Sequence, residues 1–418
     1  MTIPDDWTIS TVEQLCYFEN NRRIPVSESE RAKRPGDVPY YGANGLQGYI
    51  DSAIFNEDLI LLAEDGGHYD DFADRPIAYR ITGPAWVNNH AHVIRSRDPD
   101  FQDFLFYSLE HKDIRANIVG GTRGKLNLGQ LKNIEIAHPV NVSESIAIAE
   151  IIHLADDAIR FRRQLINKLE MMREGLLTDL LTYGVDDNGN LCYERTLKKS
   201  PIGMIPANWE IMSGARVSNL ITKGESPAWQ GYSYLEEGII FITSENVRDG
   251  FIDISNPKYI SDAFHTKLSR SQLSPRDLLI NLTGASIGRF CLFPNYILTG
   301  NISQNVAVFR TINNIIEPEF AALYLQSSIG KKALLAPLKN NARGSISLGD
   351  LGKLLFIVPP AEERAVIVES YLALQDRLNI ERTKLEKLLH LKEGLMTDLL
   401  TGQNRVPGPS PADVEVVV

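Results

Sequence analysis

The sequence has few cysteines, no excess of basic residues and no long hydrophobic run. Its three cysteines, Cys16, Cys192 and Cys291, are odd in number and far apart, which excludes a disulfide framework and a cysteine-rich zinc site. No apolar segment approaches the length that crosses a bilayer, and no secretory signal opens the chain, so we expect a cytoplasmic protein without a membrane partner. The formal net charge of -10 argues against a nucleic-acid-binding protein, whose binding surface is normally basic.

Basic residues are nevertheless concentrated in two short segments. Residues 267–310 contain a single acidic residue, Asp277, among several basic ones. Each segment is either a phosphate-binding surface or a solvated face of an acidic protein, and the sequence leaves both interpretations open. The basic residues are Arg22, Arg23, Arg31, Lys33 and Arg34 near the N-terminus, and Lys267, Arg270, Arg276, Arg289 and Arg310 in the later segment.

The chain contains an internal duplication. The segment KLEMMREGLLTDLLT at 168–182 recurs as KLLHLKEGLMTDLLT at 387–401, and IPxxWxI at 3–9 recurs at 205–211. A duplicated unit of roughly two hundred residues is too long for a solenoid repeat. We interpret it as one domain followed by one long helix, made twice, which implies internal pseudo-twofold symmetry.

The composition predicts an α+β protein with two similar mixed domains. Short strand-like and glycine-rich segments fill 1–142 and 206–359, and a single helix is expected in each, after Asp100 and from Pro318 to about Leu335. Long helices are expected at 143–182 and 360–401. Residues 183–205 are interpreted as a polar linker, and the proline-rich 402–418 as a disordered tail.

Both long helices carry an apolar stripe at heptad spacing. Two matched helices of about 40 residues, or about 60 Å, are expected to form an antiparallel intramolecular coiled coil. The stripes are interrupted at Arg162 and Glu381, which form either a register-setting pair or a layer turned toward solvent. The stripe residues are Ile148, Ile152, Ala155, Ile159, Ile166, Leu169, Leu176 and Leu180, and then Ile367, Tyr371, Leu374, Leu378, Leu385, Leu388, Leu395 and Leu399.

The sequence lacks the parts of an enzyme. A helix would hold Asp100 and Glu110 about 15 Å apart, too far to share the metal ion of a nuclease. The segment at 256–259 (NPKY) is not preceded by a glycine-rich cofactor loop, and the segment at 120–125 (GGTRGK) has the wrong glycine spacing for a phosphate loop. No histidine or cysteine cluster has metal-ligand spacing. We therefore expect a non-catalytic chain that holds no metal or cofactor.

Polar and basic residues beside glycines occur in both halves instead. Asn, Gln, Arg, Ser and Thr side chains read base edges, although any one such segment is more often a turn. Because the pattern is repeated, we predict DNA contacts at these positions. They are Tyr41, Asn44, Gly45, His68, Asn88, Asn89, His90, Arg123 and Lys125 in the first half, and Ser244, Asn246, Asn281, Thr283, Ser286, Arg289, Ser303, Gln304, Asn305, Arg343 and Ser345 in the second.

These segments resemble the DNA-specificity subunit of type I restriction–modification systems. The resemblance rests on YYGxNG at 40–45, NNHAHV at 88–93, PIGMIPxxW at 201–209, ISQNV at 302–306 and PPxE at 359–362, and it extends over residues 3–401. The helix endings GLL at 175–177 and GLM at 394–396 also resemble that family. One departure is HPVNV at 138–142, where the family tends toward the PPxxE form.

The resemblance implies two target-recognition domains, each reading half of a split double-stranded DNA sequence. The helices would set the spacer and dock two modification (methyltransferase) subunits, and restriction subunits would join them. S-adenosylmethionine, ATP and Mg²⁺ would belong to those partners. The helix positions assigned to register or partner docking are Arg162, Glu381, Leu176, Leu180, Leu395 and Leu399.

Two other classes of function remain open on the sequence. One is a bivalent scaffold whose duplicated domains bind protein ligands. The other is a methyltransferase or nuclease with a degenerate site, which S-adenosylmethionine binding by the isolated chain would support.

Overall fold

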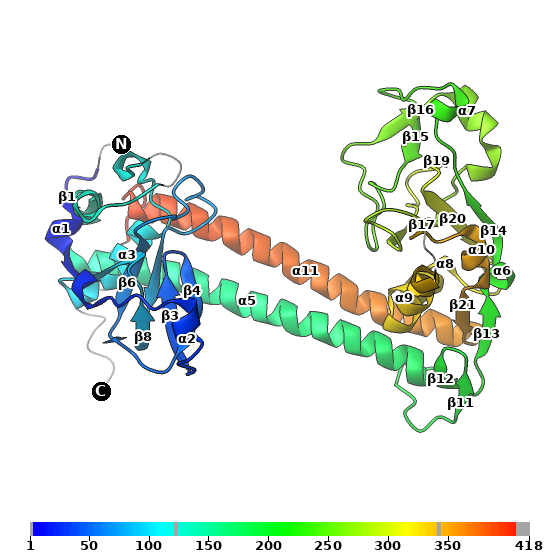
Figure 1. The fold of residues 1–418 in the computed structure, drawn as a ribbon, viewed down its shortest axis with the longest axis horizontal. Coiled ribbons are helices and arrows are strands. Elements are labelled where there is room, and N and C mark those ends of the chain that lie inside the picture. Colours follow the sequence, from blue (N-terminus) through cyan, green and yellow to red (C-terminus); the bar gives the residue numbers. More distant parts are fainter. Residues whose placement is uncertain (1–2, 121–123, 341–343, 407–418) are drawn as a thin grey trace. The chain divides into compact units, whose positions relative to one another are not determined.

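A computed structural model describes residues 3–120, 124–340 and 344–406. The chain divides into two compact units, which are called the first unit (Met1–Gln164 with Arg382–Val418) and the second unit (Leu165–Glu381). Each unit contains one mixed domain and part of each of two long helices, α5 (Val142–Tyr183) and α11 (Ala361–Leu400), as Figure 1 shows. Each long helix is therefore divided between the units and does not belong to the preceding domain alone.

The first unit is built on a four-stranded antiparallel sheet. Its order is β2 (Cys16–Phe18), β9 (Ala91–Ser96), β6 (Leu59–Ala63) and β7 (Ala78–Ile81). All five residues of β6 are buried. Because side chains alternate along a strand, Ile60 and Leu62 enter one hydrophobic cluster and Leu59 and Leu61 enter another. The apolar run of β6 thus reflects a strand that is covered on both faces.

A second sheet of the first unit has the order β4 (Gly45–Ile50), β3 (Val38–Gly42), β8 (Pro84–Val87) and β5 (Phe55–Asn56), with β3 and β8 parallel. The strands β1 (Trp7–Thr11) and β10 (Glu135–Pro139) pair antiparallel and bring the two ends of the domain together before α5. The short helices are α1 (Val12–Leu15), α2 (Glu28–Arg31), α3 (Gln102–Glu110) and α4 (Leu128–Lys132). The helix expected after Asp100 corresponds to α3.

The second unit repeats this strand order. Its four-stranded sheet is β14 (Ser218–Lys223), β20 (Val306–Thr311), β17 (Leu278–Asn281) and β18 (Phe290–Leu292). Its three-stranded sheet is β16 (Lys258–Ile260), β15 (Ile239–Ile242) and β19 (Asn301–Ile302), with β15 and β19 parallel. β13 (Glu210–Ser213) pairs with β21 (Leu355–Val358), as β1 pairs with β10.

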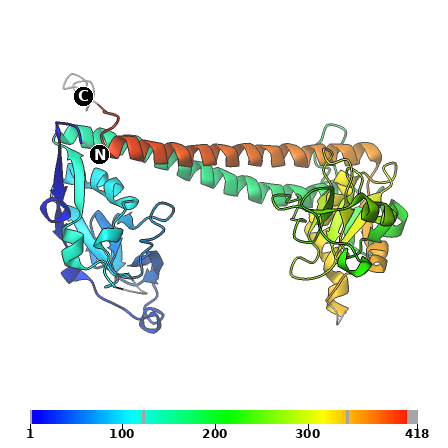
Figure 2. The ribbon, with the colours of Figure 1, turned by 90° about the horizontal axis from the view of Figure 1, so that it is seen from above.

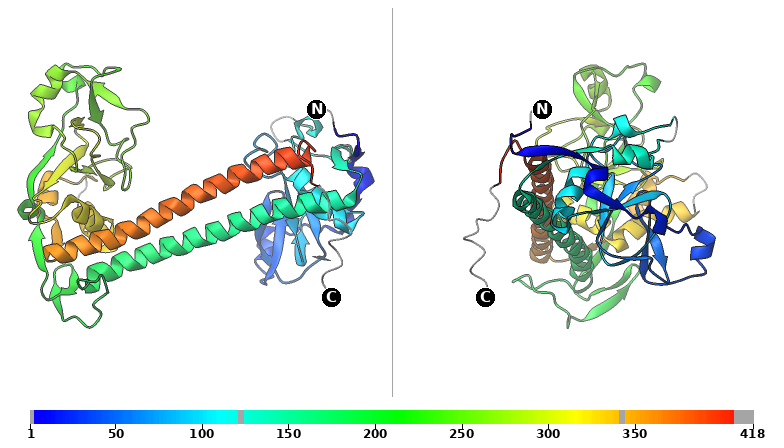
Figure 3. Two further views of the ribbon diagram at one scale, coloured as in Figure 1. Left: turned by 180° about the vertical axis from the view of Figure 1, so that it is seen from behind. Right: turned by 90° about the vertical axis from the view of Figure 1, so that its left-hand side faces the viewer.

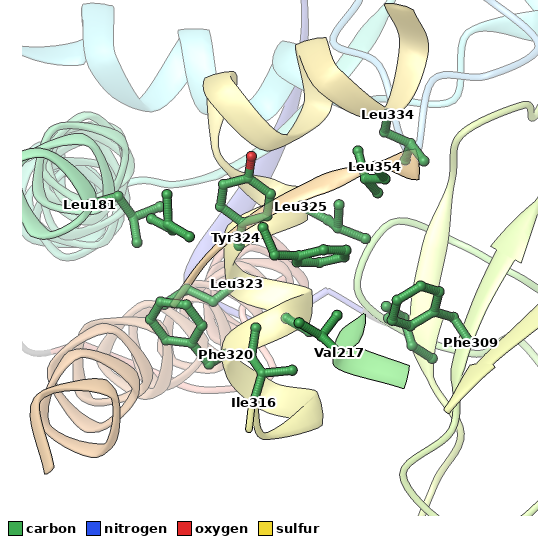
Figure 4. Packing of buried hydrophobic residues seen from close by; sticks show 14 of the residues in the cluster. Leu181, Val217, Phe309, Ile316, Phe320, Leu323, Tyr324, Leu325, Leu334 and Leu354 are labelled. Carbon is green, nitrogen blue, oxygen red and sulfur yellow. The ribbon is translucent and has the colours of Figure 1, made fainter. Parts of the chain in front are cut away.

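The helices of this domain are α6 (Gly214–Val217), α7 (Asp262–Lys267), α8 (Pro318–Gln326), α9 (Ser328–Leu335) and α10 (Leu348–Lys353). α6, α8, α9 and α10 pack around a core that contains Phe309, Phe320 and Tyr324 and receives Leu181 from the end of α5 (Figure 4), whereas Phe264 of α7 packs in a separate cluster with Phe241 and Ile260. Each fully buried large apolar side chain stabilises such a core by about 1.5–3 kcal/mol.

The prediction of a single helix from Pro318 to about Leu335 was wrong. The structure has two helices with Ser327 between them, and the Ser327 Oγ accepts a hydrogen bond from the Gly330 amide at 3.1 Å. A Cβ atom at Gly330 would collide with the carbonyl oxygen of Tyr324. The apolar spacing continues through the break, so periodicity did not reveal it.

The long helices pair in opposite directions within each unit. In the first unit Ile148 of α5 lies in the same cluster as Leu399 of α11, and Asp156 Oδ1 is 2.8 Å from Lys392 Nζ. Figure 2 shows these two helix segments side by side. In the second unit Arg173 Nη1 donates to Gln375 Oε1 at 3.0 Å. These pairings and the repeated strand order confirm the α+β fold with two similar domains and antiparallel helices.

Each long helix is followed by a glycine in the left-handed conformation. After that glycine an arginine pairs with a glutamate near the start of the other long helix, and this contact is called a clasp. Gly184 has φ 71° and Gly402 has φ 72°, the conformation that ends many helices. After Gly184 the chain turns back, and Arg195 pairs with Glu363 at the start of α11. Trp209 Nε1 donates to the same carboxylate at 3.0 Å. After Gly402, Arg405 Nε donates at 2.7 Å to Glu144, near the start of α5.

These clasps correct two expectations drawn from composition. The segment expected as a linker, 183–205, contains β11 (Leu197–Ser200) and most of β12 (Gly203–Pro206), which form a hairpin near the end of α5 (Figure 3). Within the expected tail, Arg405 also donates to Asp6 Oδ1 at 2.7 Å, and Val406 packs against the core, so residues 402–406 are attached to the first unit. The remainder of the tail, 407–418, lies outside the described residues.

Candidate nucleic-acid interface

In the first unit, polar segments far apart in sequence meet where several strands end. The Asn88 amide donates to the Tyr41 carbonyl at 3.0 Å, and the Glu64 amide donates to the His90 carbonyl at 2.8 Å. The Leu126 amide in turn donates to the Glu64 carbonyl at 2.8 Å. The segments 41–45, 64–68, 88–90 and 124–126 therefore form one surface, which is called the first loop surface.

The second unit holds its polar segments by the same pattern of backbone bonds. The Ser303 amide donates to Ile242 at 2.9 Å, the Leu282 amide to Asn305 at 2.8 Å, and the Ile346 amide to Leu282 at 2.9 Å. The segments 243–246, 281–289, 303–305 and 344–346 are therefore called the second loop surface.

These matching bonds define equivalent positions in the two units. His90 occupies the position of Asn305, because each accepts the bond from the segment after the central strand. Isolated bridges join Asp65 to Lys125 and Thr283 to Ser345, so Asp65 and Thr283 are also equivalent. The backbone frame is repeated, whereas its side chains differ in charge and hydrogen-bonding character.

Several residues predicted to contact DNA are used inside the protein. Asn88 is only 5% exposed; its Oδ1 accepts from the His90 amide at 2.8 Å and its Nδ2 donates to Gln47 Oε1 at 3.3 Å. Asn246 accepts from the Thr243 amide at 2.9 Å. These two amides shape the loops and do not present their polar groups outward.

Asn281 has a similar internal role in the second loop surface. It is fully buried, and its Nδ2 donates to the Ser244 carbonyl at 2.9 Å and to Ser286 Oγ at 3.0 Å. Asn281 Oδ1 and the buried Ser303 Oγ have no hydrogen-bond partner among the described residues. The predicted site residues Ser244, Asn281 and Ser286 are thus brought together, with Asn281 beneath the other two.

Other predicted residues are accessible on the two surfaces. Asn44, at the tip of the β3–β4 hairpin, donates to the Gly66 carbonyl at 2.9 Å, and Gly45 closes that hairpin at φ 101°. Arg123 and Arg343 lie outside the described residues. The exposed residues are Asn44, Asn89, His90 and Lys125, and the half-buried ones are Tyr41, Gly45, His68, Ser244, Thr283, Ser286, Arg289, Gln304, Asn305 and Ser345.

A charge cluster lies at the centre of the first loop surface. Glu64 accepts from Arg23 Nη1 at 2.8 Å and lies 3.3 Å from Lys125 Nζ. Burial opposes its charged form, but Arg23 and Lys125 outweigh burial and lower the pKa of the Glu64 carboxyl. Arg23 also donates to the carbonyl of Ala91 at 2.8 Å. This arginine therefore joins two segments of the surface.

The buried side chain of His92 connects two other segments beneath the same surface. It is 1% exposed, its Nε2 donates to the Leu126 carbonyl at 2.7 Å, and its Nδ1 then accepts from Asn20 Nδ2 at 3.0 Å. Burial lowers the pKa of His92, which favours this neutral form. Asn20 was not singled out from the sequence, because its partner lies 72 positions away and no local motif marks it.

Most arginines of the two basic segments form ion pairs within the protein. Near the N-terminus Arg34 Nη2 lies 2.7 Å from Asp51 Oδ1. In the later segment Arg310 Nε lies 2.6 Å from the buried Asp277 Oδ1, and Arg276 Nε donates to Glu319 at 2.7 Å. Arg289 forms no ion pair within the described ranges, so it is the cation of the second loop surface with a free charge.

The helix positions assigned to docking fall in two groups. Leu180 and Leu399 are buried in the cores of the second and first unit, so neither offers a surface to a partner. Leu176 and Leu395 are half-buried and pack against the same cores. Heptad spacing marks the apolar stripe but does not separate its core positions from exposed ones.

The register positions differ in burial. Glu381 is fully buried and lies 3.2 Å from Arg377 Nε on its own helix, while Arg162 is half-buried. A register-setting role for Arg162 and Glu381 stays a prediction.

The residues that resembled a nuclease motif have other roles. Glu110 Oε2 lies 2.9 Å from Lys392 Nζ, and Asp100 is exposed in the turn before α3. Among the described residues, no group of three or more His, Cys, Asp or Glu side chains has a metal-binding arrangement. In the same part of the chain, no helix is both long and apolar enough to span a membrane.

Comparison with known proteins places this chain in a family. Residues 4–171 and 231–390 match the family described as type I restriction modification DNA specificity domain. The chain is 23% identical to the specificity subunit of the type I restriction enzyme MjaVIII of Methanocaldococcus jannaschii, over 97% of this chain and 95% of that protein. It is 24% identical to the EcoBI specificity subunit of Escherichia coli, over 88% of this chain and 79% of that protein.

A solved structure shows the same fold. The crystal structure of the type I restriction–modification S subunit from M. genitalium superposes with a TM-score of 0.60 at 16% identity, covering 96% of this chain and 98% of that one.

Proposed function

The chain belongs to the family of type I restriction–modification DNA specificity domains, and we propose that its two loop surfaces each read one half of a bipartite double-stranded DNA sequence. The observation that carries this proposal is the repeated backbone frame with different side chains. Equivalent positions hold His90 and Asn305, or Asp65 and Thr283, so two similar domains present different hydrogen-bonding groups. Two different half-sites are therefore expected.

The acidic net charge does not oppose this function. Most arginines of the basic segments are paired within the protein, and the proposed contacts are confined to two surfaces. Partner subunits add further phosphate contacts, which dominate the affinity of most DNA complexes. The chain alone is therefore expected to bind DNA weakly, and with its partners strongly.

We propose that two modification subunits dock on the paired helices and that restriction subunits join the assembly. In this proposal the chain is non-catalytic, and S-adenosylmethionine, ATP and Mg²⁺ belong to the partner subunits. The assembly would act in the cytoplasm, where it meets the DNA. A solved chain of similar fold, with a TM-score of 0.56 at 16% identity, comes from work on complex assembly and conformational transition of a type I restriction–modification system.

The test is to reconstitute the chain with its modification subunits and to measure methylation and binding across salt concentrations. We expect modification at one bipartite sequence, with affinity that falls steeply as salt rises. Protein ligands bound without any sequence-selective DNA binding would favour a bivalent scaffold. Binding of S-adenosylmethionine by the chain alone would favour a degenerate methyltransferase.

A further inference from the structure

On the first loop surface, the partner of His90 selects one tautomer of its neutral ring. Its Nδ1 lies 3.0 Å from both carboxylate oxygens of Asp65. A carboxylate only accepts hydrogen bonds, so the proton of the neutral ring must be on Nδ1. Nε2 of the neutral ring is then an acceptor. The His90 side chain is 46% exposed and the Asp65 side chain 22%, so the pair lies at the surface.

Hydrogen bonds fix the backbone of His90 and of the residues before and after it. The His90 amide donates to Asn88 Oδ1 at 2.8 Å, and its carbonyl accepts from the Glu64 amide at 2.8 Å. Arg23 Nη1 donates to the carbonyls of the two flanking residues, Asn89 at 3.3 Å and Ala91 at 2.8 Å. The imidazole therefore projects from a fixed backbone, which reduces the entropy lost when it makes a directional contact.

We propose that His90 reads an exocyclic amino group in the first half-site through Nε2. In the major groove the amino groups are N6 of adenine and N4 of cytosine, the donors that a fixed acceptor recognises. Guanine offers only acceptors there, and a phosphate oxygen is also an acceptor, so both are disfavoured partners for this tautomer. The inference rests on the proposed DNA-reading function and adds the chemical group that is read.

The second unit provides a matched contrast. Asn305 occupies the position of His90, but its amide can both donate and accept. Thr283 stands where Asp65 stands in the first unit. The selection of an amino group by a fixed acceptor is therefore specific to the first domain.

The experiment uses the reconstituted complex of full chain and modification subunits, and duplexes of its identified target. Each adenine of both half-sites is replaced singly by purine, and each cytosine by 2-pyrimidinone, which removes one amino group at a time. Binding is measured for the natural chain, His90→Ala and the matched control Asn305→Ala. Comparing all combinations isolates the contact from the weaker base pairing of the analogues.

We expect one position at which loss of the amino group weakens binding by about 5- to 150-fold for the natural chain. At that position the effect of removing the amino group should fall, for His90→Ala, to the part that weaker base pairing alone causes, whereas Asn305→Ala should keep the full discrimination. Asp65→Asn should reduce the discrimination. An amide can donate a hydrogen bond to Nδ1, so the proton of the neutral ring is no longer held on Nδ1 and can lie on Nε2.

Failure of this inference and failure of the proposed function give different results. If the complex binds its bipartite target but no amino-group position depends on His90, the inference is wrong while the proposed function stands. If the complex shows no sequence-selective DNA binding, the proposed function itself is wrong. A His90-dependent guanine, detected with 7-deazaguanine, would show that the ring acts as a donor and would also overturn the inference.

Discussion

Individual polar residues on the loop surfaces have two distinct roles. Asn281 is buried and bonds the backbone of Ser244, whereas Arg289 is half-buried and forms no ion pair within the described residues. The first holds a loop in place, and the second has a charge available for DNA. Substitutions at these two positions should therefore be separable by experiment.

We expect Arg289→Ala and Gln304→Ala to weaken recognition of the second half-site by about 1–3 kcal/mol each, without lowering the melting temperature. Asn281→Ala should also weaken that recognition, but it should reduce the free energy of unfolding by about 1–3 kcal/mol, because the Ser244 carbonyl and the Ser286 hydroxyl lose a buried hydrogen-bond partner. Thermal denaturation and binding to half-site variants measure the two effects. Equal relaxation of both half-sites would contradict independent reading by the two domains.

Glu64 should make the stability of the first unit depend on pH. Its pKa is lowered in the folded protein, so its contribution is complete above the ordinary glutamate pKa and is lost as pH falls through the lowered value. At about pH 7, Glu64→Gln should be less stable than the natural chain, and the difference should shrink as the pH falls through the lowered pKa of Glu64. Urea denaturation at several pH values measures this. A difference that stays constant would show that the charge on Glu64 does not stabilise the fold.

The sequence indicated which segments carry polar loops, but not which side chains turn inward. Asn88 bonds Gln47 and Asn281 bonds Ser244, partners that are 41 and 37 positions away. An asparagine beside a glycine has the same local pattern in either role. The inward orientation is set by tertiary packing, which no local motif records.

At the scale of secondary structure, apolar periodicity located the long helices well. The expected ranges, 143–182 and 360–401, differ from α5 and α11 by one residue at each end. Periodicity did not detect the break at Ser327, because the cap leaves the apolar spacing unchanged. It did not detect the β11–β12 hairpin either, because that hairpin is short and polar. The clasps through Arg195 and Arg405 depend on carboxylates distant in sequence and were missed for the same reason.

The two units anchor their helix pairs with different chemistry. In the first unit Lys392 of α11 contacts Glu110 of α3 at 2.9 Å and Asp156 of α5 at 2.8 Å. In the sequence repeat Lys392 aligns with Arg173, whose bond in the second unit is to the neutral Gln375 at 3.0 Å. The first junction is therefore an ion-pair network and the second a single charge-assisted hydrogen bond.

We expect Lys392→Met to lower the free energy of unfolding by about 2 kcal/mol, because two carboxylates in a largely buried site lose their cation. Arg173→Met, the matched control, should cost only about 1 kcal/mol. Chemical denaturation measures both. Equal losses would show that the charged network adds nothing to helix anchoring.

The positions Arg162 and Glu381 carry a separate prediction about helix register. If they form a pair, reversing either charge should destabilise the protein, and exchanging both should restore much of the loss in a double-mutant cycle. Strictly additive effects would favour the interpretation that this layer faces solvent.

At the scale of the whole molecule, both long helices are shared by the two units. The chain passes from one unit to the other only through α5 and through α11. Residues inserted into both helices therefore lengthen both connections between the two loop surfaces. We propose that the helices set the spacer between the half-sites. The sequence repeat allows insertions at matched positions, after Gln164 in α5 and after Thr383 in α11.

Insertion of seven residues at both positions keeps the apolar stripes in phase and adds about 10 Å of helix. The preferred spacer should then grow by about three base pairs, since each base pair rises about 3.4 Å along the duplex. The half-sites should stay unchanged, because neither loop surface is altered. Affinity should fall, since three base pairs do not complete a turn of the duplex and the second half-site is rotated about its axis. Methylation-sensitive sequencing of a strain that carries the lengthened chain measures the spacer directly. Undiminished recognition of the original spacer would show that the helices do not set this distance.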